Sequence, residues 1–348
     1  MFTDNPIGHW QRRRRSRAAE RSAGHQQGMS IVEVMVSMTV GLLVLSFLTV
    51  IFVNSSNTRR EIDKSADIYE NGRYGLLVLG DELSHAGYYG TLSAVSPGAT
   101  TDLPCSTTVA DWESSLALAV RGSNHSDMGI PLGLFDCING SRKTDTDVLF
   151  LQRAATCVAG VGACAGLVAA DIYVQVSECG AEYSTNPFVL AANSGLPYTL
   201  QDKDCTPGTL APVRKFIRRI FFVGSDDRLQ YVDIGPLGAG PPVPLAENIE
   251  NMQVEYGVDT NGDSSPDCFA SVPADCPPVT AGWWTQVVGA RIWLLARAPQ
   301  VTAGYTDDKT YTMGDLDAAA YAAGLNTGYK RHVFTGYFNF VNPQGRME

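Results

Sequence analysis

An acidic residue, Glu33, stands directly before a long uncharged segment of the chain. Residues 34–53 carry no charge and are long enough to cross a bilayer as a helix, since each helical residue adds about 1.5 Å. A carboxylate beside hydrocarbon is costly, which makes Glu33 a candidate functional residue. If the chain were cut after Gly28, the free amine of Met29 could pair with Glu33 of a neighbouring helix at low dielectric and fix the offset between the two helices. The alternative is that Glu33 only lies at the lipid interface.

Eight cysteines form a second candidate set, and all of them follow the apolar segment. An even number, confined to the part of the chain that would be exported, predicts disulfides formed in an oxidising compartment. A zinc site or free thiols are the alternative, although no C-x-x-C pair occurs. Short loops cost least entropy to close, which favours Cys157 with Cys164 and Cys268 with Cys276. The disulfide candidates are Cys105, Cys137, Cys157, Cys164, Cys179, Cys205, Cys268 and Cys276.

An acidic stretch, residues 259–267, has the alternating oxygen-bearing side chains that calcium binds in some loops. It departs from the calcium-loop pattern, because Ser264 stands at the sixth position and Ala270 at the twelfth. A turn stabilised by Asx side chains is the favoured interpretation, and a calcium site is the second. The four candidate ligands are Asp259, Asn261, Asp263 and Asp267.

Charge is divided unevenly along the chain. Six arginines and two acidic residues give residues 1–28 a charge of 6 − 2 = +4, so the total of −10 leaves −10 − 4 = −14 for the rest. An acidic body is a poor binder of nucleic acid. The basic run 214–219 (RKFIRR) could touch DNA, but a strand whose long side chains cover their neighbours is the commoner case. No G-x-S-x-G, H-E-x-x-H or Walker motif occurs, so no catalytic residue is predicted.

The elements around Glu33 set its orientation in a membrane. Arginines crowd the N-terminal side of residues 34–53, so that side is predicted to stay cytoplasmic and the bulk of the chain to be exported. A secretory signal peptide has a shorter apolar region followed by a small-residue cleavage site, which is missing here. A plain single-pass anchor remains an alternative on composition.

The string GMSIVE, from Gly28 to Glu33, lies between a basic leader and the apolar segment. It resembles the processing motif of type IV prepilins and type II secretion pseudopilins. The resemblance implies that a prepilin peptidase cuts between Gly28 and Met29 and methylates the new N-terminus. Glu33 would then be the fifth mature residue and would set subunit register in a filament. Methionine stands at Met29 where the family often has phenylalanine, and the leader is long for the family.

Four further segments narrow the resemblance to the PilW group of minor pilins. Residues 69–74 (YENGRY) and 81–90 (DELSHAGYYG) resemble that group's helix and the turn after it. Residues 245–257 (LAENIENMQVEYG) and 329–338 (YKRHVFTGYF) resemble two of its strands. Residues 95–210 match no part of the pattern.

A repeat of apolar residues every seven positions predicts that the helix continues to Ala86, with Gly87 as its C-cap. From Ser30 such a helix is about 85 Å long. Three glycines within it each weaken a helix by up to about 1 kcal/mol, which predicts support from packing. The repeat is Ile62, Tyr69, Leu76 and Leu83, and the glycines are Gly72, Gly75 and Gly80.

Beyond residue 90, short β-like runs are separated by Gly, Pro, Asn and Asp. The stretches 95–145 and 178–210 read as long insertions. The predicted class is α+β and type IV pilin-like, with the long N-terminal helix packed on an antiparallel β-sheet that carries disulfide-stapled insertions. The predicted strands are Asp147–Arg153, Asp171–Ser177, Val213–Val223, Arg228–Asp233, Asn248–Val258, Gln286–Ala296 and Arg331–Val341.

Four domains are predicted: a basic prepilin leader (1–28), a transmembrane and filament-core helix (29–53), its amphipathic continuation (54–90) and an exported β-rich domain (91–348). The resemblance implies a non-enzymatic minor pilin in a priming or tip complex for type IV pilus assembly. Its expected partners are prepilin peptidase, other minor pilins, the major pilin and a tip adhesin. Its expected location is the inner membrane, with the C-terminal domain periplasmic, and then the pilus. The alternatives are a J-type minor pseudopilin of type II secretion and a membrane-anchored adhesive or binding domain.

Overall fold

The computed structural model describes residues 28–93, 104–125, 135–138, 140–192, 197–272, 275–277 and 282–344. The predicted leader, apart from Gly28, lies outside these residues. The chain divides into two compact units, Met1–Thr58 and Arg59–Glu348. Helix α1, Ile31–Ser84, contributes to both units.

Helix α1 agrees with its predicted bounds to within two residues at each end. After Ser84 the chain makes a turn, and Gly87 takes a φ of 71°, the left-handed conformation that the predicted C-cap requires. The Gly87 amide donates to the Gln152 carbonyl at 2.9 Å. The helix end is therefore attached directly to a strand.

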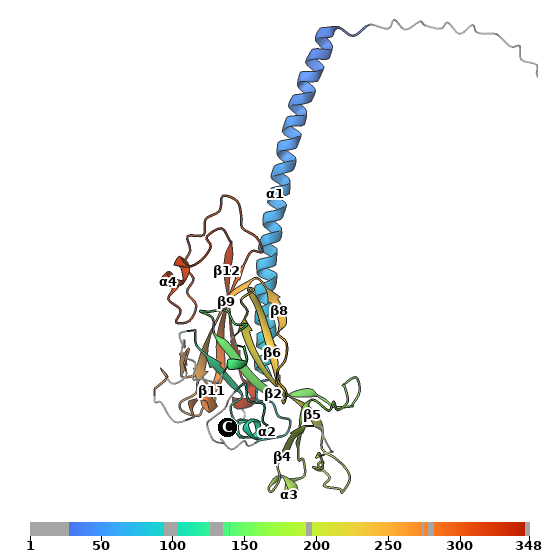
Figure 1. The fold of residues 1–348 in the computed structure, drawn as a ribbon, viewed down its shortest axis with the longest axis vertical. Helices are drawn as coiled ribbons and strands as arrows, with labels where there is room; N and C mark the ends of the chain where they lie inside the picture. The colour runs from blue at the N-terminus through green and yellow to red at the C-terminus, as the bar shows by residue number, and fades with distance from the viewer. Residues whose placement is uncertain are drawn as a thin grey trace, which may run out of the picture. The chain divides into compact units, whose positions relative to one another are not determined.

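The second unit contains two antiparallel sheets, where the sequence predicted one. Strand β5 pairs with β2 on one side and with both β3 and β6 on the other. In the smaller sheet the order is β10-β9-β11-β12. Figure 1 shows β12, β9, β6 and β8 beside the lower part of α1, and β4 and α3 beyond its C-terminal end. The strands are β1 Val120–Ser123, β2 Val148–Val158, β3 Ile172–Val176, β4 Phe188–Ala192, β5 Val213–Val223, β6 Arg228–Gly235, β7 Gly238–Ala239, β8 Val243–Glu247, β9 Ile249–Val258, β10 Cys268–Ala270, β11 Val287–Arg297 and β12 Arg331–Asn339.

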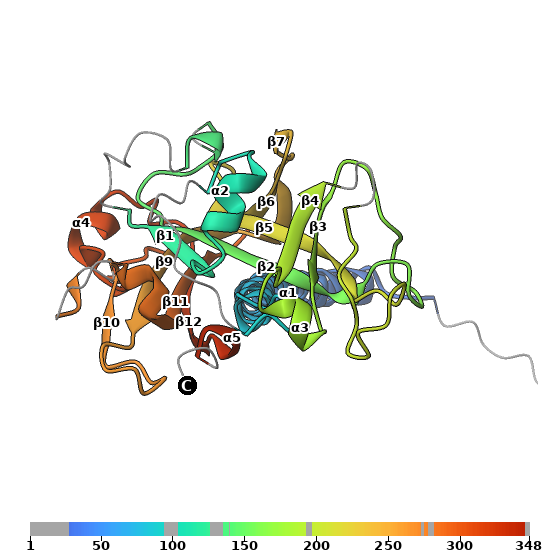
Figure 2. The same ribbon diagram turned by 90° about the horizontal axis from the view of Figure 1, so that it is seen from below.

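Short helices lie in the connections between strands. In Figure 2, seen from below, the strands β9 to β12 group together, apart from β3, β4 and β5. The two sheets meet at Asp147, which directly precedes β2. The buried carboxylate of Asp147 accepts the Val254 amide of β9 at 2.7 Å. The helices are α2 Val109–Ser114, η1 Asp136–Ile138, α3 Gly180–Tyr183, η3 Trp283–Gln286, α4 Ala318–Ala323 and α5 Val341–Gln344.

All seven predicted strands are present: β5 has its predicted bounds, five others differ by at most two residues at either end, and β2 continues five residues beyond its predicted end. Five strands were missed, and each has five residues or fewer: β1, β4, β7, β8 and β10. Runs this short offer too few alternating residues to be recognised. The predicted hairpin turn at 225–227 is present, with Asp227 at φ 56° and its amide donating to Gly224 at 3.0 Å.

The core lies between α1 and both sheets. Leu79 and Leu83 are fully buried against residues of β6, β8, β9 and β11. Each such leucine contributes about 1.5–3 kcal/mol on burial. The seven-residue repeat was wrong for Ile62, which is 61% exposed, whereas Tyr69 is half-exposed at the edge of the buried face, with its ring 5.7 Å from that of Phe334 in β12. A straight helix drifts by about 20° per heptad, so the buried stripe follows the 3.6-residue period and passes through Gly72 and Gly75.

Two of these glycines permit close contact between α1 and β12. The rings of Phe334 and Phe338 approach Gly72 and Gly80 so closely that a Cβ on either glycine would overlap them. At Gly75 a Cβ would lie 2.9 Å from Leu294 Cδ1. The packing support that the sequence predicted for these helix-weakening residues is therefore present.

Replacing Gly72 by alanine is expected to lower the free energy of unfolding by about 1–3 kcal/mol, because the methyl group overpacks against Phe334. Helix propensity alone would give the opposite sign, by about 1 kcal/mol. Urea unfolding of the detergent-solubilised protein measures the difference. The control is Arg73→Ala, an exposed neighbour, which is expected to stay within about 0.5 kcal/mol. A stabilised Gly72→Ala variant would contradict the close fit.

Candidate assembly site

The predicted cleavage site lies just outside the helix. Gly28, Met29 and Ser30 are exposed and have no regular secondary structure. The first helical hydrogen bond described here runs from the Val34 amide to the Ser30 carbonyl at 3.2 Å. The Gly28–Met29 peptide bond is therefore exposed and outside regular secondary structure, as a protease requires.

Glu33 lies in the first turn of α1 and is exposed. In the part of the chain that the structure describes, its carboxylate has no ion pair or hydrogen bond. Its carbonyl accepts the Ser37 hydroxyl at 2.7 Å. A carboxylate near a helix N-terminus is stabilised by the helix dipole, and it is open to a partner outside this chain.

The segment that follows satisfies its own polar groups. The hydroxyls of Thr39, Ser46 and Thr49 donate to carbonyls three or four residues earlier, each at 2.8 Å. The side chains of residues 34–53 are all exposed, and mean hydropathy reaches 2.5 in this part of α1. Backbone and hydroxyl groups bonded within the helix, with apolar side chains outside, are what a hydrocarbon environment demands.

Glu82 fixes the other end of α1. Its side chain is buried, and Arg153 of β2 donates to it at 2.9 Å. Arg219 of β5 forms a second ion pair with Glu82 and also pairs with Asp233 at 2.7 Å. Two cations on one buried carboxylate give the helix a defined rotation against the larger sheet.

Glu61 attaches the middle of α1 to the connection between β11 and β12. Lys330 and Lys64 lie 2.6 Å and 2.9 Å from its carboxylate oxygens. Lys64 also donates to the carbonyl of Val301, in the same connection, at 3.1 Å. The hydrogen bonds from Lys330 and then Lys64 lower the pKa of Glu61 from 4.5 to about 2.

A buried ion-pair network holds the return of that connection into β12. The Arg331 guanidinium binds both oxygens of Glu250, at 2.5 Å and 3.2 Å, and Asp307 at 3.0 Å. The Tyr311 hydroxyl donates to Asp307 at 2.6 Å. These groups join β9, β12 and the connecting loop, so the loop that reaches Glu61 is itself anchored.

All eight cysteines form disulfides. The two local pairs expected from loop closure, Cys157–Cys164 and Cys268–Cys276, are both present. Cys105–Cys137 and Cys179–Cys205 close longer loops of 32 and 26 residues. The stretches read as insertions thus carry two of the four bonds.

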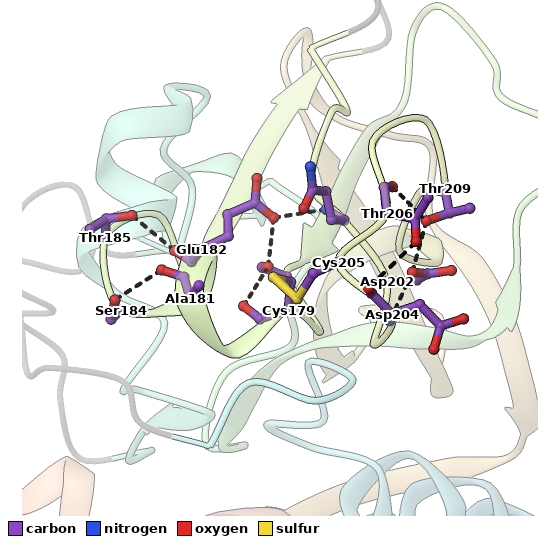
Figure 3. Close-up of a disulfide and its surroundings, with 12 residues drawn as sticks. Cys179, Ala181, Glu182, Ser184, Thr185, Asp202, Asp204, Cys205, Thr206 and Thr209 are labelled. Atoms are coloured by element: carbon purple, nitrogen blue, oxygen red, sulfur yellow. Dashed lines mark hydrogen bonds between the residues drawn. A yellow bond between two sulfur atoms is a disulfide. The ribbon is translucent and has the colours of Figure 1, made fainter.

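Figure 3 shows how one insertion is held. Cys179 directly precedes α3. It is bonded to Cys205, which lies in the connection between β4 and β5. The Glu182 carboxylate accepts the Ser177 hydroxyl at 2.7 Å and the Gln201 amide at 2.8 Å. Side-chain hydrogen bonds and a covalent bond therefore add to the apolar cluster that β3 and β4 form through Ile172, Val174 and Leu190.

The basic run 214–219 lies on β5, and its charges are used within the domain. Arg218 is buried, with Trp112 and Phe150 rings each 5.0 Å from its guanidinium. Lys215 pairs with Asp171 at 2.8 Å. Arg214 donates to the carbonyl of Thr156, and Arg219 pairs as described above. The structure thus supports the interpretation of a covering strand and not that of a DNA-binding patch.

The acidic stretch 259–267 has the hydrogen bonds of an Asx turn. Asp259 is buried, and its carboxylate accepts the amides of Asn261, Gly262 and Ser264 at 2.6–3.1 Å. Asp267 accepts both the amide and the hydroxyl of Thr260, each at 2.8 Å. Within the described residues, no group of three or more His, Cys, Asp or Glu could hold a metal ion. The calcium hypothesis has no support from this geometry.

A cleft of about 460 Å³ lies between α4 and the sheets, lined in part by Lys143, Glu250 and Asp317. Lys143 pairs with Asp227 at 2.5 Å, and Glu250 pairs with Arg331. Asp317 caps α4 by accepting the amides of Ala319 and Ala320 at 3.0 Å. These charged groups form ion pairs within the domain or cap a helix. Their arrangement gives no support to a catalytic role for the cleft.

Sequence reasoning missed the attachments of α1. Glu82 sits in the quoted segment 81–90, yet nothing in the sequence indicated that it is buried beside two arginines. Glu61 was not singled out in the sequence at all. A helical wheel drawn through Ile68, Leu79 and Leu83 would have placed Glu82 at the margin of the buried face, which is the signal that was available.

Comparison with known families supports the resemblance in part of the chain. Residues 220–342 match the PilW family model, described as type IV pilus-assembly protein W. The recognition of PilW from the sequence is thereby confirmed over this segment, which contains residues 245–257 and 329–338. The N-terminal motifs lie outside the matched residues.

Other comparisons add little. A search of characterised proteins finds no match in sequence. Among solved structures, a type IV-like pilin from Thermus thermophilus aligns at 12% identity, covering 79% of this chain and 96% of that chain, with a TM-score of 0.35. A TM-score this low supports no argument about the present chain.

Acid is expected to remove the contribution of Glu61 to stability. Its folded pKa is lowered, so the ion pairs stabilise the fold above about pH 4.5, and this stabilisation is lost as the pH falls toward about 2. Glu61→Gln should therefore be less stable than the wild type near neutral pH, with the difference vanishing near pH 2. Urea unfolding across this range measures it.

Asp63→Asn is the matched control, because it removes an exposed carboxylate that has no ion pair in the described part of the chain. Its difference from the wild type is expected to stay the same at every pH. A Glu61→Gln difference that is equally independent of pH would show that the ion pairs with Lys64 and Lys330 do not contribute.

Proposed function

From the match of residues 220–342 to the PilW family, we propose that the chain is a minor pilin of the type IV pilus. In this proposal, prepilin peptidase cuts after Gly28 and methylates Met29. Residues 34–53 hold the protein in the inner membrane until a pilus is assembled. The protein then joins other minor pilins in a priming or tip complex and acts by assembly, without catalysis.

The observation that carries the proposal is the division of α1 along its length into two segments of different chemistry. Residues 34–53 are apolar on every side and exposed, whereas from Ile68 onward only one stripe is buried against the sheets. A helix that is apolar all round needs a surrounding apolar medium. The bilayer can supply that medium before assembly, and packed helices of other subunits can supply it afterwards.

Glu33 has the position that this function requires. It is the one charged residue between Gly28 and Arg59, and it has no partner among the described residues. In a low-dielectric helix bundle, an unpaired carboxylate strongly favours a neighbour that brings a positive charge. The amine released at Met29 lies four residues away in sequence, and it could meet Glu33 of a subunit displaced along the filament axis.

The size of the exported domain supports a terminal position in a filament. Insertions held by Cys105–Cys137 and Cys179–Cys205 add bulk around the sheets. A bulky domain leaves little room for neighbours on every side. A tip, where neighbours are fewest, accommodates it best.

Cleavage after Gly28 is tested by mass spectrometry of the protein purified from membranes. The expected N-terminus is N-methyl-Met29. Gly28→Val is expected to leave the basic leader in place, because a side chain at the cleaved bond obstructs the peptidase. Ser30→Ala, two residues away, should be processed normally. A wild-type protein that keeps its leader would end the pilin proposal and leave a membrane-anchored domain in its place.

Glu33→Gln separates assembly from processing. The variant is expected to be cleaved and methylated, but to yield at least tenfold fewer pili, because loss of a buried ion pair costs several kcal/mol. Sheared pili are counted by electron microscopy and immunoblot. Ser37→Ala, one turn further along α1, is the control and should assemble as the wild type does. Normal piliation in Glu33→Gln would exclude a role in register.

A further inference from the structure

Two arginines follow the apolar segment on its exported side. Arg59 is six residues beyond Val53, which is about 9 Å along a helix. The polar head-group layer on each side of a bilayer is roughly 5–7 Å thick. Arginine side chains have long apolar stems that can reach back toward a membrane surface. Arg59 and Arg60 are therefore within reach of phosphate groups when residues 34–53 fill the hydrocarbon layer.

Both arginines are exposed, and the described part of the chain offers neither of them an ion pair or hydrogen bond. Most cations of the exported domain behave differently: Arg153 and Arg219 bind Glu82, and Lys330 binds Glu61. The carboxylate next in sequence, Glu61, is taken by Lys64 and Lys330. The guanidinium groups of Arg59 and Arg60 are thus left free for a partner outside the chain.

The position of this pair opposes the usual charge bias of membrane proteins. Basic residues favour the cytoplasmic side, and positive charge on the exported side weakens the preferred orientation. The six arginines before residue 28 outweigh the pair, so the orientation is kept. A basic pair at this disfavoured place is explained most directly by an anionic ligand at the membrane surface.

We propose that Arg59 and Arg60 bind the phosphate groups of anionic phospholipids in the leaflet facing away from the cytoplasm. Bidentate guanidinium–phosphate contacts would set the depth of α1 in the bilayer before assembly. The contact is made only while the subunit is in the membrane and is lost when it enters a filament. This inference rests on the proposed function, because it requires residues 34–53 to span the bilayer.

The test measures lipid selectivity in vesicles that contain the full-length protein. Spin-labelled phosphatidylglycerol and phosphatidylcholine report, by electron paramagnetic resonance, how much of each lipid is immobilised at the protein surface. An arginine at a membrane surface favours anionic lipid by about fivefold. The R59Q/R60Q variant is therefore expected to lose at least fivefold of the wild-type preference for phosphatidylglycerol. The leader arginines are present in every sample and cancel in this comparison.

Arg73 supplies the matched control on the same helix. It too is exposed and has no partner in the described residues, but it lies about 21 Å further along α1 than Arg59, beyond a Debye length of about 8 Å. Arg73→Gln is expected to keep the wild-type lipid preference. An equal loss in Arg73→Gln and R59Q/R60Q, or no loss in R59Q/R60Q, would overturn the inference.

Labelled phosphatidylcholine separates this inference from the proposed function. A helix that spans the bilayer immobilises neutral lipid whatever its flanking charges. Immobilised phosphatidylcholine without any effect of R59Q/R60Q would refute the head-group contact alone. Absence of immobilised phosphatidylcholine would refute the membrane span, and with it both proposals.

Discussion

A buried carboxylate at the end of α1 determines how this helix meets the rest of the protein. Glu82 is shared by Arg153 and Arg219, which come from adjacent strands of the larger sheet. Removing one partner of such a buried pair typically costs about 3–5 kcal/mol, because a charge is left without compensation. The pairing therefore favours one rotation of the helix, and that rotation turns Gly72 and Gly80 toward β12. Residues 34–53 have no comparable contact among the described residues, since all of their side chains are exposed.

The second unit, Arg59–Glu348, combines two ways of maintaining structure. Around α1 the sheets bury leucine, isoleucine and phenylalanine side chains in a continuous core. Around β3, β4 and α3 a smaller apolar cluster is supplemented by Cys179–Cys205 and by hydrogen bonds to the Glu182 carboxylate. A disulfide closing a loop of this length contributes roughly 3–4 kcal/mol, which is comparable to burying one or two large apolar side chains. Disulfides form and persist mainly in oxidising compartments, so these bonds agree with the proposed export of this domain.

Periodicity, charge and the number of cysteines were sufficient to predict α1, the longer strands and the presence of disulfides. The 20 uncharged residues and the β-like runs bounded by Gly, Pro, Asn and Asp are local signals of a helix and of strands, and the structure contains both. The division into two sheets was missed, because the contact between Asp147 and Val254 links residues more than a hundred positions apart. Ile62 was placed on the wrong face and Tyr69 lies at its edge, since the repeat that contains them omits the glycines at the true centre of the buried stripe. The burial of Arg218 could not be predicted either, because the rings that pack against it, Trp112 and Phe150, lie on other elements.

The fit of Phe334 and Phe338 against Gly72 and Gly80 has a mechanical consequence. Each ring occupies a notch where the helix has no side chain, and moving α1 along its own axis would bring a Cβ-bearing residue beneath each ring. Steric overlap, in addition to apolar attraction, therefore resists sliding. A tensile load applied along α1 would pass into β12 as shear spread over both notches, the direction in which interlocked surfaces yield least readily. Traction on the helix would thus be borne by the sheet as a whole, without peeling away its outermost strand.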